Sequence, residues 1–148
     1  MTASAFEADL ETALADATRA RADLVSTVQC LTEADLDKVK RGGWPIHRVI
    51  THTIEHDYYM AMFVASARGE RFTGSSDATC GGQSIDEVLC RMEAGRTALL
   101  SAVNGIAEDD FYTLKTIGLE EFSPLSAIEN AATHDREHLE QVHSILAS

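Results

Sequence analysis

Six histidines provide most of the chemistry that this chain of 148 residues could perform. Four of them form two pairs at a spacing of four residues, His52 with His56 and His134 with His138. On a helix, this spacing puts both side chains one turn apart on the same face. Imidazole is a good ligand for zinc, nickel, iron and copper, so two histidines from one turn and a third from a facing helix make a workable metal site. Three protein ligands leave coordination positions open, which is the catalytic rather than the structural pattern.

The same histidines also have an ordinary interpretation. Pairs four residues apart arise by chance in amphipathic helices, and in that interpretation His56 is a hydrogen-bonded core residue, while His47 and His143 are solvated. Asp135, on the apolar face of its helix, has two interpretations as well. It could orient a ligand histidine, or it could make a hydrogen bond between helices.

Both histidine pairs also match His-x-x-Glu-His, the inverted zinc-peptidase pattern, at residues 52–56 and 134–138. Glu55 or Glu137 would then be the general base. Two copies in one small helical chain, with no obvious third ligand for either, argue against a peptidase.

Four long segments must position these residues. Apolar residues recur at three- and four-residue steps, which predicts helices over about residues 5–30, 45–68, 84–104 and 123–147. Serines that begin capping boxes, and Pro45 as the first residue of the second helix, support these starts. The expected fold is all-α, a four-helix bundle formed by a single domain over residues 1–148.

The connections indicate the order of the helices. The loop at 69–83 is rich in glycine, serine and threonine, and fully extended it spans about 45–50 Å. It can therefore return the chain along a whole helix, so the second and third helices can run parallel. The connector at 105–122 is also long, which leaves its direction ambiguous. If the second and last helices are antiparallel neighbours, His52 and His138 lie at nearly the same height.

Composition excludes several classes of protein. Asp and Glu number 24 against 12 Lys and Arg, a formal net charge of −12, which argues against nucleic acid or an anionic membrane surface as partner. No apolar stretch is long enough to span a membrane, and the acidic N-terminus does not resemble a signal peptide. Three cysteines without a Cys-x-x-Cys pair indicate reduced thiols. We expect a cytoplasmic protein.

Positive charge is concentrated in one segment. Lys38, Lys40, Arg41 and Arg48 lie within eleven residues, and residues 38–54 contain no acid. This segment adjoins the N-terminus of the second helix, which has a partial positive charge of its own. We expect it to attract an anionic small-molecule substrate or thiol; the alternative is that these side chains only solvate a loop.

Two segments resemble one known family. GGWPIHRVITHTIEHDYYM, at residues 42–60, has a tryptophan after a glycine-rich turn and a histidine eight residues later, Trp44 and His52. SPLSAIENAATHDREHLEQVHSIL, at residues 123–146, has two histidines four residues apart and a glutamine three residues further on: His134, His138 and Gln141. Together with the order of the elements, these motifs resemble the DinB-like metal-binding four-helix bundles over essentially the whole chain.

The resemblance implies an up-down-down-up bundle with its long loop between the second and third helices. It implies a divalent metal held by His52, His134 and His138, with zinc or nickel as first candidates and iron or manganese next. It implies a homodimer. Some relatives are transferases or isomerases that use a low-molecular-weight thiol such as mycothiol or bacillithiol.

Two residues depart from the family pattern, and three functions remain open. Pro45 replaces the usual Ser or Thr, and His56 adds a fourth imidazole that could join or displace His52. The first function is a metal- and thiol-dependent transferase or isomerase acting on a small molecule. The second is a non-catalytic metal- or ligand-binding protein with a stress or regulatory role. The third is a degenerate member without metal, retained for dimerisation.

Overall fold

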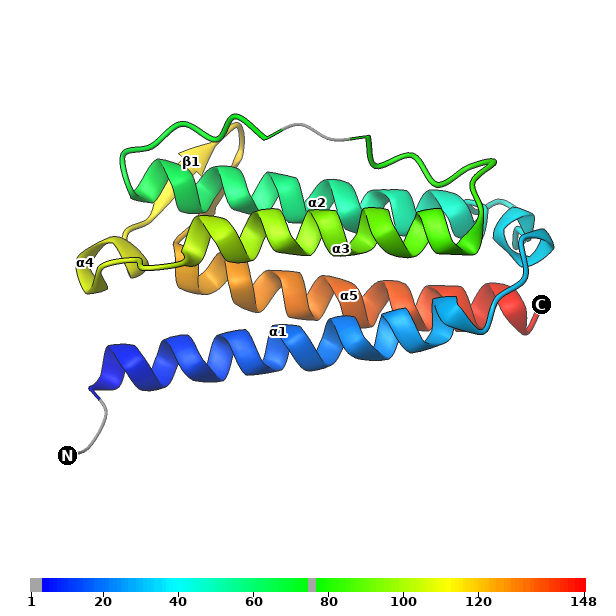
Figure 1. Cartoon of the computed structure of the whole chain (residues 1–148), viewed down its shortest axis with the longest axis horizontal. Coiled ribbons are helices and arrows are strands. Elements are labelled where there is room, and N and C mark those ends of the chain that lie inside the picture. Colours follow the sequence, from blue (N-terminus) through cyan, green and yellow to red (C-terminus); the bar gives the residue numbers. More distant parts are fainter. Residues whose placement is uncertain (1–3, 75–76) are drawn as a thin grey trace.

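Four long helices dominate the structure, a computed structural model that describes residues 4–74 and 77–148. They are α1 (Ala5–Gln29), α2 (Ile46–Ala67), α3 (Ile85–Val103) and α5 (Pro124–Leu146). Figure 1 shows α1 and α5 running in one direction and α2 and α3 in the other. The predicted all-α class is confirmed, and the predicted helix bounds agree with the observed ones to within one residue.

Shorter elements fill the connections. They are the 3-10 turn η1 (Ala34–Asp37), the single helical turn α4 (Glu108–Phe111) and the strands β1 (Lys115–Ile117) and β2 (Glu120–Phe122). The two strands pair antiparallel, with Ile117 opposite Glu120. Gly118 has a φ of 63°, so it supplies the left-handed conformation that a tight hairpin turn requires. This hairpin is absent from the predicted elements, because strands of three residues are too short to show a period.

Three of the long helices begin with a serine cap. The Ser4, Ser84 and Ser123 hydroxyls accept from backbone N–H groups three residues on, each at 3.1 Å. Helix α2 differs, because Pro45 is its N-cap and provides no side-chain acceptor. The prediction that Pro45 is the first helical residue is wrong by one position, since its ψ of 157° is extended. The first N–H groups of α2 therefore lack a side-chain cap.

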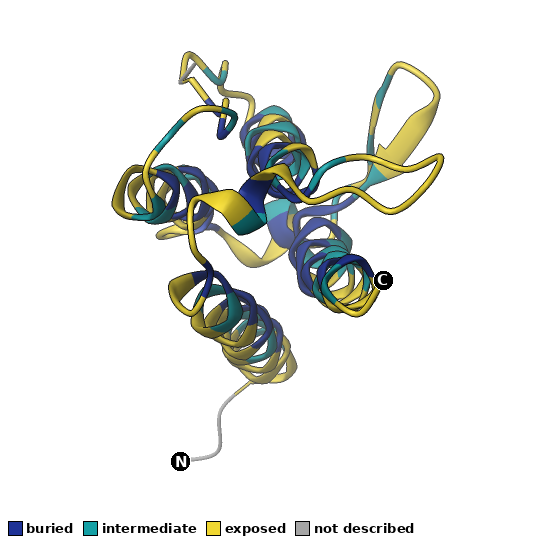
Figure 2. Ribbon diagram, turned by 90° about the vertical axis from the view of Figure 1, so that its right-hand side faces the viewer, coloured by how far each residue is buried: buried dark blue, intermediate teal, exposed yellow. Residues whose placement is uncertain are grey.

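The buried faces of the four helices point inward (Figure 2), and most of their buried residues are apolar. The buried residues form two clusters, one that includes Phe63, Leu99, Phe111 and Ile128 and another that includes Leu24, Ile50, Met92 and Val142. Complete burial of one such side chain stabilises the fold by about 1.5–3 kcal/mol. Two clusters in one bundle imply a boundary layer between them, and four buried charged residues form it.

Two other expectations from composition can be checked. The three cysteines are free thiols; Cys30 and Cys90 are exposed, and Cys80 is buried. Within the described ranges, no helix is both long enough and apolar enough to cross a membrane.

Candidate metal centre

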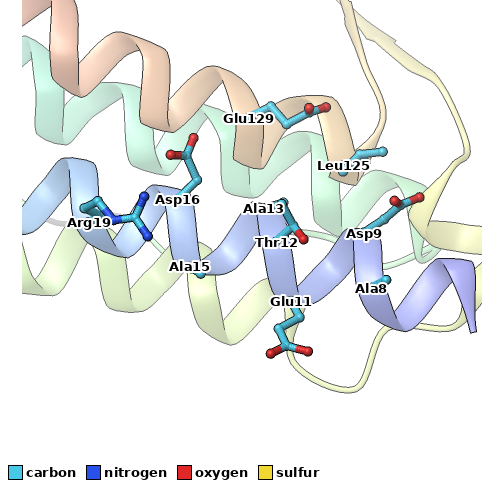
Figure 3. Close-up of a pocket in the computed structure, with 10 residues that line it drawn as sticks. All are labelled: Ala8, Asp9, Glu11, Thr12, Ala13, Ala15, Asp16, Arg19, Leu125 and Glu129. Atoms are coloured by element: carbon cyan, nitrogen blue, oxygen red, sulfur yellow. The ribbon is translucent and has the colours of Figure 1, made fainter. Parts of the chain in front are cut away.

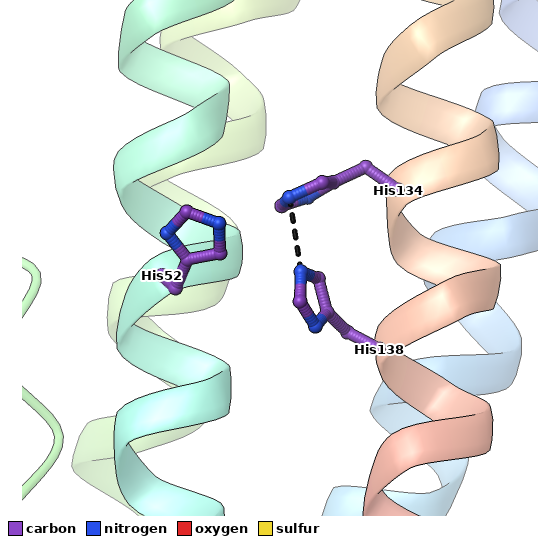
Figure 4. A group of neighbouring side chains, drawn as sticks. All are labelled: His52, His134 and His138. Carbon is purple, nitrogen blue, oxygen red and sulfur yellow. Dashed lines mark hydrogen bonds between the residues drawn. The ribbon is translucent and has the colours of Figure 1, made fainter. Parts of the chain in front are cut away.

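His52 on α2 faces His134 and His138 on α5 (Figure 4). One ring nitrogen from each residue can be chosen so that all three lie within 4.8 Å of one another. The Nε2 atoms of His134 and His138 are 2.9 Å apart. The structure therefore brings together the three histidines that the sequence singled out as metal ligands.

The separations suit a shared ion. Two nitrogens bound to one zinc at the usual bond length of about 2.0–2.1 Å are about 2.9–3.4 Å apart at ordinary coordination angles. The 2.9 Å between the Nε2 atoms of His134 and His138 falls in this range. The third nitrogen, on His52, lies within 4.8 Å of the other two. The donor set therefore fits a metal that prefers imidazole.

Gln141 orients one ligand ring. Its Oε1 lies 2.8 Å from Nδ1 of His138. Because an amide oxygen only accepts, Nδ1–H of His138 donates to it, and the lone pair remains on Nε2, the atom that faces His134. A second hydrogen bond that fixes the tautomer and the ring plane is typical of metal-binding histidines.

His134 has the most perturbed ring of the group. Burial, followed by the neighbouring imidazoles of His56, His138 and His52, lowers its pKa to about 2. Its Nδ1 is the one buried side-chain nitrogen or oxygen within residues 4–74 and 77–148 that has no hydrogen-bond partner. Burial also lowers the pKa of His52, and the charge of His138 adds to that effect. These rings are therefore held neutral, which is the form that binds a metal.

His56 lies beside the triad and outside the cluster of three ligand atoms. Its ring stacks on His134 with centroids 3.8 Å apart and an interplanar angle of 13°. Its Nε2–H donates to the Oδ1 of Asn130 at 2.8 Å. His56 is therefore hydrogen-bonded, as in the ordinary interpretation, but it is half-buried at the cleft and not a core residue, and it supports the back of the His134 ring.

The remaining histidines lie elsewhere. His143 is hydrogen-bonded to the hydroxyl of Thr27 at 3.3 Å, and His47 is half-buried against the loop near Gly81. The group of three takes one histidine from the 52–56 motif and two from the other. A peptidase site of this kind would take its pair of histidines from a single motif. The group of three draws on both motifs, so it does not match such a site.

Trp44 forms one wall of the site. Its ring contacts the edge of His52 at a centroid distance of 5.4 Å, and the guanidinium of Arg48 lies 5.0 Å from its centre. The spacing of eight residues between Trp44 and His52 thus corresponds to a direct contact between their rings.

An open cleft of about 510 Å³ leads to the triad between α2, α5 and the hairpin. The residues that line it are almost all polar: Arg48, His52, Glu55, His56, Tyr59, Glu120, Asn130 and His134. Arg48 pairs with Glu55 at 3.1 Å, and the Tyr59 hydroxyl donates to Glu120 at 3.2 Å. Sequence reasoning missed the roles of Asn130 and Glu120, because only the folded chain places them beside the histidines.

The other edge of the site is cationic. A smaller hollow of about 180 Å³ is lined by Lys40, Arg41 and Trp44 together with Gln141. Lys40 donates to the hydroxyl of Ser144 at 2.9 Å, and Arg41 forms no ion pair with any residue in the described ranges. Arg48 and Lys38 are each paired with a carboxylate. The positive segment found in the sequence therefore divides, and Lys40 and Arg41 keep charge available for a ligand.

A larger hollow of about 560 Å³ lies elsewhere, between α1 and the first turns of α5 (Figure 3). Its charged residues are Asp9, Glu11, Asp16, Arg19 and Glu129. Tyr112 donates to Asp9, and Arg136 pairs with Asp16. It contains no histidine or cysteine, so it is a weaker candidate for chemistry than the cleft at the triad.

Comparisons with known proteins agree with this geometry. Residues 16–142 match the sequence profile of the DinB superfamily. The chain is also similar to a DinB-like protein from Bacillus cereus ATCC 10987 whose crystal structure is known, with a TM-score of 0.71 and 18% sequence identity. That match covers 93% of this chain and 90% of the other. No curated protein of known function matches significantly.

Proposed function

This chain belongs to the DinB superfamily, whose members bind metals, and on that premise we propose that His52, His134 and His138 hold one divalent ion for catalysis. The observation that supports this most is the convergence of three imidazoles from α2 and α5 beside an open cleft. The all-nitrogen donor set suits zinc or nickel first and iron next, and manganese is a further candidate only through the family resemblance.

The proposed reaction is a transfer or isomerisation of a small molecule that uses a low-molecular-weight thiol. A bound divalent metal supplies a Lewis acid that lowers the pKa of a thiol or water. Three protein ligands leave room for such a molecule. The chain itself contributes the orientation of the ligand rings, through Gln141 and His56, and the walls of the cleft, through Trp44, Tyr59 and Asn130.

The two edges of the site suggest how a substrate is oriented. Lys40 and Arg41 at one edge, together with the uncapped N-terminus of α2, favour an anionic group. At the other edge Glu55 is paired with Arg48, so Glu120 is the residue that disfavours one. We therefore expect an anionic substituent to point toward Lys40 and Arg41.

Metal content is the first test. Protein purified without a histidine tag should contain about one divalent ion per chain by elemental analysis. His52→Ala and His138→Ala should lose most of it, whereas His143→Ala, which removes an imidazole outside the triad, should retain it. A wild-type protein without stoichiometric metal, or triad variants that retain full metal, would contradict the proposal.

A non-catalytic binding protein is the second candidate, and the contact of Trp44 with His52 favours it, because the indole covers part of the triad. Cobalt substitution separates the two. If a thiol such as 2-mercaptoethanol changes the visible spectrum of the cobalt protein, open positions are accessible and the enzyme is favoured. If no thiol or anion changes it, the binding protein is favoured. We also expect a homodimer, which light scattering would test.

A further inference from the structure

Each long helix contributes one buried charged residue to the middle of the bundle. These residues, here called the quartet, are Arg21 on α1, Asp57 on α2, Arg96 on α3 and Asp135 on α5. The arginines are 7% exposed and the aspartates 1%. Two positive and two negative charges leave the quartet neutral. Asp135 thus makes contacts between helices, the second of its two interpretations.

The quartet is a closed set of hydrogen bonds. Arg21 donates to Asp57 at 2.8 Å and to both oxygens of Asp135 at 3.0 and 3.1 Å. Arg96 donates to Asp57 at 3.2 Å and to Asp135 at 2.7 Å. Each aspartate therefore contacts both arginines. If any one of the four helices slides along its axis, at least two of these hydrogen bonds break.

The remaining arginine donors join α1 and α3, which are neighbours in the bundle with little direct contact. Arg21 donates to the carbonyl of Met92 on α3 at 3.1 Å, and Arg96 donates to the carbonyl of Ala17 on α1 at 2.9 Å. Helices α1 and α3 have few direct contacts compared with the other neighbouring pairs. Their relative position therefore depends strongly on these two side chains.

The quartet lies directly behind the candidate metal centre. Asp57 follows His56 in the chain, and Asp135 follows His134, and these two imidazoles are the stacked pair. Along every long helix the quartet member falls between residues of the two apolar clusters. Any change in the register of α2 against α5 at this layer moves His52 relative to His134 and His138.

Stability alone does not account for four buried charges. Removing ions from water costs free energy, and well-packed apolar residues in place of a buried ion pair are often neutral or stabilising. Apolar side chains tolerate a small slide of one helix against another, whereas bidentate arginine–carboxylate hydrogen bonds require a defined geometry. One residue along a helix corresponds to a shift of about 1.5 Å, which is enough to separate three ligands.

We propose that Arg21, Asp57, Arg96 and Asp135 are positioning residues that fix the register of α2 against α5 and so preorganise the histidine triad for metal. This inference rests on the proposed metal function. The close approach of α3 supports it, since a Cβ on Gly95 would lie 3.1 Å from Oδ2 of Asp57 and 3.0 Å from Cγ2 of Ile54. A glycine there leaves room for the Asp57 carboxylate.

The decisive variant replaces the whole quartet with apolar residues of similar size: Arg21→Met, Asp57→Leu, Arg96→Met and Asp135→Leu. We expect a folded helical protein whose affinity for cobalt, followed by its visible absorption, falls at least about tenfold. The matched control is Asp16→Ala with Arg136→Ala, which removes an exposed ion pair between α1 and α5. This control should bind cobalt like the wild type.

A second measurement does not depend on metal. In the metal-free wild type, proton NMR should show cross-relaxation between the stacked rings of His56 and His134, and the apolar variant should lose it. If the apolar variant folds and keeps both this signal and the cobalt affinity, the inference is wrong. If the wild type shows the signal and the apolar variant loses it, but the wild type binds no metal, the metal function fails and the role of the quartet in positioning the rings stands.

A milder variant covers the case in which the apolar variant does not fold. Gly95→Ala keeps all four charges and adds one methyl group against Asp57. We expect it to fold, to bind cobalt several-fold more weakly and to shift the cobalt spectrum. A folded Gly95→Ala protein with unchanged affinity, spectrum and ring signal would overturn the inference.

Discussion

Individual side chains decide whether three imidazoles form a metal site or only a polar contact between helices. Gln141 holds His138 in one tautomer, and His56 supports the flat face of His134. Neither residue belongs to the group of three ligands. Such residues matter because a ligand ring that rotates freely loses conformational freedom when a metal fixes it, and this loss lowers the affinity for the metal. A partner that already holds the ring reduces the loss.

Gln141→Leu is therefore expected to weaken metal binding by about tenfold to a hundredfold, since removing the partner of a ligand histidine has typically that effect. Competition with a chromophoric chelator measures the change. Glu140→Leu, on the adjacent position of α5, serves as the control and should bind like the wild type. Equal affinities for the two variants would show that Gln141 does not orient His138.

At the scale of the elements, two features place the ligands. Helices α2 and α5 are antiparallel (Figure 1), so a histidine in the first half of α2 meets histidines in the middle and second half of α5. The serine caps fix where α3 and α5 begin, whereas α2 begins at Ile46, after Pro45, without a side-chain cap. The Ile46 N–H at that start instead donates to the carbonyl of Lys38 at 3.0 Å, and this start of α2 lies beside the cationic edge of the site.

Ser84→Ala is expected to lower the free energy of unfolding by about 1 kcal/mol, because it removes the acceptor for the Glu87 N–H at the start of α3. Urea denaturation followed by circular dichroism measures this. The metal content should not change, since α3 contributes no ligand. Ser101→Ala, on an exposed position of the same helix, is the control, and a loss of similar size there would contradict the capping role.

The sequence predicts some elements of the fold and not others. The period of apolar residues predicts all four long helices, and the pairs at positions 52–56 and 134–138 predict which helices carry imidazoles. The choice of His52 over His56 came from the family resemblance, because both residues suit a metal on spacing alone. The hairpin at 115–122, the contact of Glu120 with Tyr59 and the quartet depend on pairings between distant segments, for which one sequence provides no signal.

At the scale of the whole molecule, the net charge of −12 conceals an uneven distribution. Lys40 and Arg41 lie at one edge of the triad, and Glu120 lies at the other, where Glu55 is paired with Arg48. The electrostatic potential therefore changes sign between the two edges of the site. The approach of charged ligands thus depends on salt concentration.

Arg41→Glu is expected to weaken the binding of an anionic thiol to the cobalt protein several-fold at low salt, through lost attraction and added repulsion. Spectral titration with 3-mercaptopropionate measures the effect, and 2-mercaptoethanol, which has no charged tail, should show a smaller change. Arg71→Glu carries the same change of charge in the 69–83 loop. Should both variants behave alike, the effect would come from net charge and not from the cationic edge.

The polar layer in the middle of the bundle has a further consequence for how this protein can evolve. His52 and His138 lie on the side of this layer that contains Ile50 and Val142, and His134 lies at the layer itself, next to Asp135, whereas Phe63, Phe111 and the hairpin belong to the other half. The layer between the two halves has a fixed geometry, so it separates changes of packing in one half from the packing of the other half. The hairpin half can therefore accumulate substitutions that reshape the far end of the cleft while the metal ligands stay in place, so new substrates can be acquired without rebuilding the metal centre.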